Sequence, residues 1–246
     1  MVDPIIKVIT IFYYIGVNKK VEEKNGQENM MKVLQEHAIR DQMDKLERYR
    51  VLNQDVKKGE ILFVGSSLME QFPINELLMT AGIDRVIYNR GIGGFTTNDM
   101  LEHMDEMVFA VEPSKIFINI GTNDIGSPEY RLEKLLENYE EIIRQIQEKL
   151  PDAQISMLAY YPVNETDKIP DEKMRKHMFS TRTNANIRIA NEAVKKLAEK
   201  LGCQFINVSH GLTDESGKLK KEYTIEGIHM YANGYRVVLQ NLKEFL

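Results

Sequence analysis

The chain of 246 residues contains only one cysteine, Cys203, and this scarcity excludes two classes of protein. A single cysteine can form neither an internal disulfide nor a cysteine metal cluster. A catalytic cysteine would need a histidine partner and some exposure to solvent. Cys203 lies in "LGCQFINV", which has the composition of a buried strand start. We therefore expect Cys203 to be an inert thiol of the core.

An excess of positive charge is also missing. The chain has 32 Lys and Arg against 37 Asp and Glu, a formal net charge of -5 and a pI of about 5.7. Because a phosphate backbone is bound by basic surfaces, we expect no nucleic-acid partner. With 43% hydrophobic and 28% charged residues, the composition is typical of a globular enzyme, and we expect a cytoplasmic one.

No hydrophobic run has the length of a membrane span. The apolar stretch "PIIKVITIFYYIGV", residues 4–17, is shorter than the ~20 residues that a span needs, and it contains Lys7. No basic region precedes it and no small-residue cleavage site follows it, so a signal peptide is not predicted. We expect residues 1–30 to form a peripheral segment that packs on the domain edge or mediates association into a homo-oligomer.

Several binding and catalytic motifs are missing too. The chain has neither the G-x-S-x-G elbow of classical α/β-hydrolases nor the phosphate loop G-x-x-x-x-G-K-[ST]. "GIGGFT" lacks the glycine spacing of a dinucleotide-binding loop. No spacing of His, Asp and Glu indicates a metal site. We therefore expect no cofactor and no metal.

Residues 31–246 contain a regular alternation of strand and helix patterns. Apolar runs predict strands at 60–65, 85–91, 114–121, 153–162 and 203–208. Helical spacing of apolar residues predicts helices at 31–49, 75–82, 97–108, 132–150, 181–202 and 234–246, with Thr97 as an N-cap and Gly82 and Gly202 as C-caps. The charged stretch 163–183 reads as a loop or lid. Such alternation predicts one α/β domain with a doubly wound parallel sheet.

Four polar or glycine-rich clusters follow the predicted strands, where an open parallel sheet brings side chains together. They are Ser66 and Ser67, "NRGIGGFT" (89–96), "GTND" (121–124) and "EGIHMYANGY" (226–235). Each alone could be a helix cap, a tight turn or a surface histidine. Together they supply a nucleophile, a base, an orienting acid and oxyanion donors, which are the groups that acyl transfer needs.

His229 is the best candidate for the base among the five histidines. Glu226 precedes it by three residues, and this spacing can place a carboxylate against the far nitrogen of the imidazole. His210 has only Asn207 at the same offset. We expect the other three histidines to be structural or solvated: His37, His103 and His177.

In their order and position, these four clusters resemble the four sequence blocks of the SGNH (GDSL-type) hydrolase superfamily. Within that superfamily, they most resemble the blocks of the platelet-activating-factor acetylhydrolase-like esterases. The resemblance implies a flavodoxin-like three-layer α/β/α sandwich with a five-stranded parallel sheet. It implies that Ser67 is the nucleophile, His229 the base and Glu226 the orienting acid. The oxyanion donors would be the N–H groups of Ser67 and Gly94 and the side-chain amide of Asn123. The implied function is that of a serine esterase that cleaves small acetyl or short-chain esters through an acyl-enzyme.

Two residues depart from the family pattern. Ser66 and Glu226 both stand where the family usually has Asp. We expect Ser66 to alter local hydrogen bonding more than the chemistry, and some hydrolase triads use Glu. The alternative hypothesis is a degenerate, non-catalytic member that binds carbohydrate or a protein partner, and a third is an interaction module that associates through the apolar N-terminus. The 163–183 segment has five basic residues that could favour an anionic substrate or simply be solvated: Lys168, Lys173, Arg175, Lys176 and Arg182.

Overall fold

The computed structural model of the protein describes residues 22–165 and 169–246. The described chain divides after Glu47 into two units, of which the second is Arg48–Leu246. Helix α2 (Glu22–Leu52) extends beyond both ends of the helix predicted at 31–49. The apolar stretch 4–17 and Lys168 lie outside the described residues, so the role of residues 1–30 stays a prediction. Within the described ranges, no helix combines the length and the apolar character that crossing a membrane requires.

The second unit is built on a parallel sheet of five strands. They are β1 (Ile61–Gly65), β2 (Ile87–Gly91), β3 (Lys115–Asn119), β4 (Gln154–Leu158) and β5 (Gln204–Ile206). Their order is β2-β1-β3-β4-β5, and every neighbouring pair is parallel. The prediction of a doubly wound five-stranded sheet is confirmed. Because the strand order reverses between β1 and β3, the carboxyl ends of these two strands border the crevice in which such folds place their sites.

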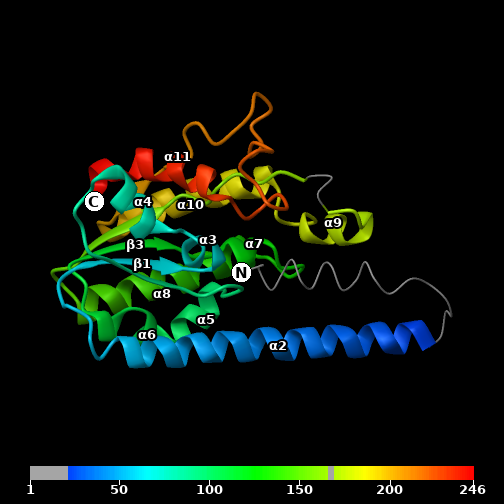
Figure 1. Ribbon diagram of the computed structural model, residues 1–246, viewed down its shortest axis with the longest axis horizontal. Coiled ribbons are helices and arrows are strands. Elements are labelled where there is room, and N and C mark those ends of the chain that lie inside the picture. Colours follow the sequence, from blue (N-terminus) through cyan, green and yellow to red (C-terminus); the bar gives the residue numbers. More distant parts are fainter. Residues whose placement is uncertain (1–21, 166–168) are drawn as a thin grey trace. The chain divides into compact units, whose positions relative to one another are not determined.

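Helices cover both faces of this sheet. Figure 1 shows α4 (Ile74–Ala81) and α11 (Ala232–Leu242) above it, and α5 (Thr97–Glu102) and α8 (Leu132–Lys149) below it. Helix α10 (Asn184–Leu201) packs against α8. The helical spacing of 132–150 predicts one apolar stripe, and most of it is buried: Leu135, Tyr139, Ile142, Ile143 and Ile146. The other three residues of the stripe are only partly buried: Leu132, Leu136 and Leu150. The remaining short elements are α3 (Ser67–Glu70), α6 (Met104–Met107), η1 (Phe109–Val111), α7 (Thr122–Ile125), α9 (Glu172–Met178) and η2 (Lys243–Phe245).

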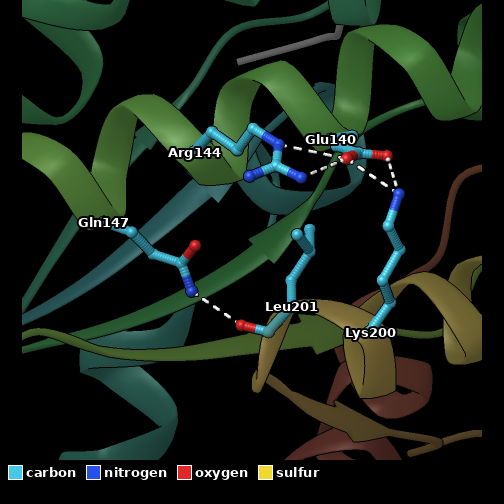
Figure 2. Close-up of polar contacts among 5 residues, drawn as sticks. All are labelled: Glu140, Arg144, Gln147, Lys200 and Leu201. Carbon is cyan, nitrogen blue, oxygen red and sulfur yellow. Dashed lines mark hydrogen bonds and ion pairs between the residues drawn. The ribbon is translucent and has the colours of Figure 1, made fainter.

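Polar contacts also join α8 to α10, as Figure 2 shows. Glu140 accepts hydrogen bonds from Arg144 in its own helix and from Lys200, whose Nζ lies 2.8 Å away. Gln147 Nε2 donates to the carbonyl of Leu201 at 2.7 Å, so it satisfies one of the carbonyls that the last turn of α10 leaves without a helical partner. Because these ion pairs are exposed to solvent, they add little stability.

Three predictions about local structure are wrong. Thr96, not Thr97, is the N-cap of α5, because its hydroxyl and the carboxylate of Asp99 form a reciprocal capping box. The helix predicted at 97–108 is broken at His103 into α5 and α6. The stretch 163–183 contains the helix α9, which Asp171 caps through bonds from the N–H groups of Lys173 and Met174.

Cys203 also differs from its prediction. It precedes β5 and is half-buried, beside a hollow of about 360 Å³ that Gln147 and Gln204 help to line. The partial burial raises the pKa of its thiol to about 11. Cys203 is therefore not a core residue, although its thiol is protonated at neutral pH.

Candidate active site

Ser67 lies at the junction of β1 and α3, at the point where the strand order reverses. At Gly65 the strand comes so close to β3 that a Cβ atom would lie 2.0 Å from the carbonyl oxygen of Asn119. Only glycine permits this approach. Ser67 is the first residue of α3, so its N–H has no acceptor within the helix, and the residue is 7% exposed.

The structure brings Ser67, His229 and Glu226 together. His229 Nε2 lies 2.8 Å from Ser67 Oγ, and His229 Nδ1 contacts Glu226 Oε1. A carboxylate can only accept, so Nδ1 carries the imidazole proton and Nε2 is left to accept from the serine hydroxyl. Of the five histidines, only His229 makes a hydrogen bond to Ser67.

A closed turn fixes the positions of Glu226 and His229 relative to each other. Thr224 Oγ1 donates to the carbonyl of His229 at 2.9 Å and accepts from the N–H of Gly227 at 2.7 Å. Glu226 Oε1 accepts from the backbone N–H of His229 at 3.2 Å as well as contacting its ring. At Gly227, where φ is 104°, a Cβ would lie 1.9 Å from the carbonyl of Asn164. This geometry lets the longer glutamate reach the imidazole, which removes one of the two observations that favour a non-catalytic protein.

The predicted oxyanion donors lie in the loops after β2 and β3. Gly94 has a φ of 82°, in the left-handed region that glycine adopts without strain, and no residue of the described chain accepts from its N–H. The neighbouring Gly93 adjoins Ser67, since a Cβ there would lie 3.7 Å from Ser67 Cβ. Asn123 Nδ2 donates one hydrogen to the carbonyl of Phe95 at 2.9 Å. An amide nitrogen has two hydrogens, so this bond leaves the second available.

Ser66, the other departure from the family pattern, occupies the N-cap position of α3 without acting as a cap. Its side chain makes no capping hydrogen bond, and its residue is 1% exposed. Its Oγ has no hydrogen-bond partner in the part of the chain that the structure describes. The two serines are therefore distinct, because only Ser67 contacts the histidine.

Two residues near this site were not predicted as part of it. Glu70 Oε2 accepts from the N–H of Gly93 at 2.5 Å and so supports the loop beside Ser67. Arg182 donates from Nε to the carbonyl of Thr122 at 3.1 Å and from Nη2 to Asn123 Oδ1 at 3.3 Å. The only sequence signal for Arg182 was its membership of five basic residues in one charged stretch, which could not distinguish it from the solvated ones.

Asp124 anchors the loop that contains Asn123. It accepts hydrogen bonds from the N–H of Thr97 at 3.0 Å and from the Thr97 hydroxyl at 2.5 Å. Asn138 of α8 donates to the same hydroxyl at 3.0 Å. Burial raises the pKa of the Asp124 carboxyl, while the bonds from Thr97 oppose that shift. This network ties the loop to α5 and α8. In the described parts of the chain, no cluster of His, Cys, Asp and Glu side chains is arranged to hold a metal ion.

Comparison with known proteins agrees with this architecture. A protein from Streptococcus pneumoniae whose description names platelet activating factor is 34% identical, with a TM-score of 0.78 over 87% of this chain and 97% of that one. The human platelet-activating factor acetylhydrolase IB subunit alpha2 is 25% identical over 80% of each chain. An N-acylneuraminate cytidylyltransferase from Escherichia coli is 27% identical over 76% of this chain, which spans only 40% of that protein's length.

The family model of GDSL-like lipases and acylhydrolases matches residues 72–237. The matched range includes Gly94, Asn123, Glu226 and His229, whereas Ser67 precedes it, so the assignment of Ser67 depends on its contact with His229. The chain belongs to the GDSL-like lipase/acylhydrolase family and is an ester-cleaving hydrolase.

Proposed function

We propose that the protein is a serine esterase that removes acetyl or short-chain acyl groups from small-molecule esters through an acyl-enzyme on Ser67. The observation that carries the proposal is the continuous contact from Ser67 Oγ through His229 to Glu226. Such a chain of groups activates a hydroxyl that would otherwise be a weak nucleophile.

In the first half of the reaction, His229 Nε2 takes the proton of Ser67 as Oγ attacks the ester carbonyl. Glu226 stabilises the imidazolium that forms and keeps the ring oriented through Nδ1. The imidazolium then gives its proton to the departing alcohol. In the second half, His229 takes a proton from water, which attacks the acyl-enzyme, and returns that proton to Ser67 as the acid leaves.

The negative charge that develops on the carbonyl oxygen would be stabilised by the N–H groups of Ser67 and Gly94 and by the free hydrogen of the Asn123 amide. In such a hole, the loss of a single donor typically costs about 10²–10³ in kcat. The unoccupied N–H of Gly94, one residue from the glycine beside Ser67, supports this assignment.

A short acyl group is supported by the name of one relative and by helix α9. The human relative is named as an acetylhydrolase, whereas the relative from Escherichia coli, of whose length this chain spans 40%, is named for cytidylyl transfer to an N-acylneuraminate. Helix α9, which lies in the stretch predicted as a loop or lid, buries none of its residues, and most of them are charged or polar. A lid for long acyl chains would offer an apolar face instead.

The experiment is a panel of p-nitrophenyl esters from acetate to octanoate together with acetylated sugars, including acetylated neuraminates. Wild type should turn over the acetyl and short-chain members, and Ser67→Ala should not. Ser66→Ala is the matched control, because it removes the neighbouring serine hydroxyl and should leave turnover unchanged. Equal rates for wild type and Ser67→Ala on every ester would refute the proposal.

A further inference from the structure

Arg182 reaches the predicted oxyanion hole from the segment between α9 and α10. Its guanidinium donates from Nε to the carbonyl of Thr122 and from Nη2 to Asn123 Oδ1. Gly126 makes room for it, since a Cβ at that position would lie 2.0 Å from Arg182 Nη2. The side chain is thus fitted against the loop that contains Asn123, in a space that only glycine leaves open.

The two neighbours of the Asn123 amide fix which way it points. A guanidinium can only donate, so the side of the amide that faces Arg182 must be Oδ1. A backbone carbonyl can only accept, so the side that faces Phe95 must be Nδ2. With Oδ1 bound on one side and one amide hydrogen bound on the other, the second hydrogen of Nδ2 is the group left for a substrate oxygen.

We infer that Arg182 is a positioning residue that holds the Asn123 amide in the orientation an oxyanion donor needs. The inference rests on the proposed function and adds to it a residue outside the four family blocks. Without Arg182, Oδ1 would lose its donor, and the amide could rotate to place an oxygen where the oxyanion forms. A donor aimed in advance at the developing charge is the condition for this kind of stabilisation.

The charge of Arg182 is compatible with this role. Burial lowers the pKa of its guanidinium, whereas the negative charge of Glu226 raises it. An arginine stays protonated in proteins even so. No carboxylate of the described chain lies within ion-pair distance of it, so the guanidinium bonds are directed to Thr122 and Asn123 rather than to a counter-ion.

The first test compares Arg182→Met, Arg182→Lys and Gly126→Ala with Arg188→Met, which removes an exposed arginine from α10. We expect Arg182→Met to lower kcat on p-nitrophenyl acetate by about 10–10²-fold and to change KM by less than about threefold. Arg182→Lys should recover part of this loss, because an ammonium can still donate to Oδ1 but cannot make both bonds of the guanidinium. Arg188→Met should match wild type.

Gly126→Ala tests the same contact without altering Arg182. Gly126 has a φ of -80°, which alanine adopts without strain, so the added methyl acts by displacing the guanidinium. We expect it to lower kcat about as much as Arg182→Met. Wild-type kcat in both Arg182→Met and Gly126→Ala would overturn the inference.

A double-mutant cycle separates positioning from a direct or general structural effect. If Arg182 acts through Asn123, then Asn123→Ala and the double variant Asn123→Ala/Arg182→Met should have the same kcat, within about twofold. Multiplicative losses in the double variant would mean that Arg182 acts independently of Asn123, and they would overturn the inference.

A second readout keeps this result distinct from a failure of the proposed function. The rate at which a fluorophosphonate labels Ser67 also depends on the oxyanion hole but requires no natural substrate. Slower labelling in Arg182→Met and Gly126→Ala, with labelling in Arg188→Met unchanged, would support the inference even if no ester of the panel were hydrolysed. Equal labelling rates in wild type and in these three variants would overturn it.

Discussion

Ser67 Oγ and His229 Nε2 lie 2.8 Å apart although 162 positions separate the two residues in the chain. The sheet makes this possible, because β1 delivers Ser67 to the edge at which the strand order reverses, and the turn before α11 returns His229 to the same edge. The contact uses the nitrogen that the Glu226 carboxylate leaves free to accept a proton.

Replacing the predicted base should remove nearly all activity. We expect His229→Ala to lower kcat by about 10⁴–10⁶-fold, because Ser67 would have no group to take its proton. His210→Ala is the matched control, since His210 is exposed and makes no side-chain contact with Ser67. The measurement is steady-state hydrolysis of p-nitrophenyl acetate, and comparable rates for the two variants would refute the role of His229.

Replacing Glu226, the predicted orienting acid, should lower activity less than replacing His229. We expect Glu226→Gln to lower kcat by about 10²–10⁴-fold through loss of tautomer control and of the compensating charge. Glu226→Asp keeps the charge but is one methylene shorter, so it should retain more activity than Glu226→Gln. A near-wild-type rate in Glu226→Gln would show that another acceptor holds the imidazole.

Removing the Ser66 hydroxyl should lower neither the stability nor the activity of the protein. This buried group has no partner in the described chain, and such a group costs about 1–3 kcal/mol. We expect Ser66→Ala to raise the midpoint of thermal unfolding slightly and to keep kcat. Ser66→Asp, which restores the usual family residue, should lower the midpoint because it places a carboxylate where the residue is 1% exposed. A clear loss of stability in Ser66→Ala would mean that the hydroxyl has a partner, such as a bound water.

The reactivity of Cys203 should depend steeply on pH. Burial raises the pKa of its thiol to about 11, so the protonated, unreactive form dominates below that pH. We expect the rate of modification by a disulfide reagent in the folded protein to rise about tenfold per pH unit from pH 7 to pH 10. The same measurement in denaturant should level off near pH 8.5, the ordinary thiol value. A plateau near pH 8.5 in the folded protein would contradict a raised pKa.

Deleting residues 1–29 should leave the catalytic unit intact. The predicted site lies wholly within Arg48–Leu246, the larger of the two compact units. We expect an unchanged thermal midpoint and unchanged kcat, and a smaller oligomer by size-exclusion chromatography if this segment mediates self-association. Loss of both stability and activity would show that the segment is not peripheral. The location of the protein in the cytoplasm, which the composition led us to expect, also stays a prediction.

The sequence alone was sufficient to predict the features that depend on the pattern of neighbouring residues. Short apolar runs are strands because a parallel sheet buries both faces, and the stripe on α8 follows from helical periodicity. Ser67, Glu226 and His229 were recognisable because the family blocks keep their order and because an acid three residues before a histidine can reach its ring. Thr96 and Thr97 could not be separated, since adjacent threonines have the same capping potential and only the side-chain geometry of Asp99 decides.

Tertiary structure decided the rest, because the deciding contacts join segments that are distant in the chain. It showed that the Ser66 hydroxyl has no hydrogen-bond partner among the described residues, that Glu226 reaches the imidazole despite its extra methylene, and that Cys203 lies beside a hollow rather than in the core. Among the basic residues of the charged stretch, it singled out Arg182, since only the packing against Gly126 and Asn123 brings that guanidinium to the site. Sequence patterns report on neighbours within an element, whereas hydrogen bonds between distant loops exist only once the sheet has brought those loops together.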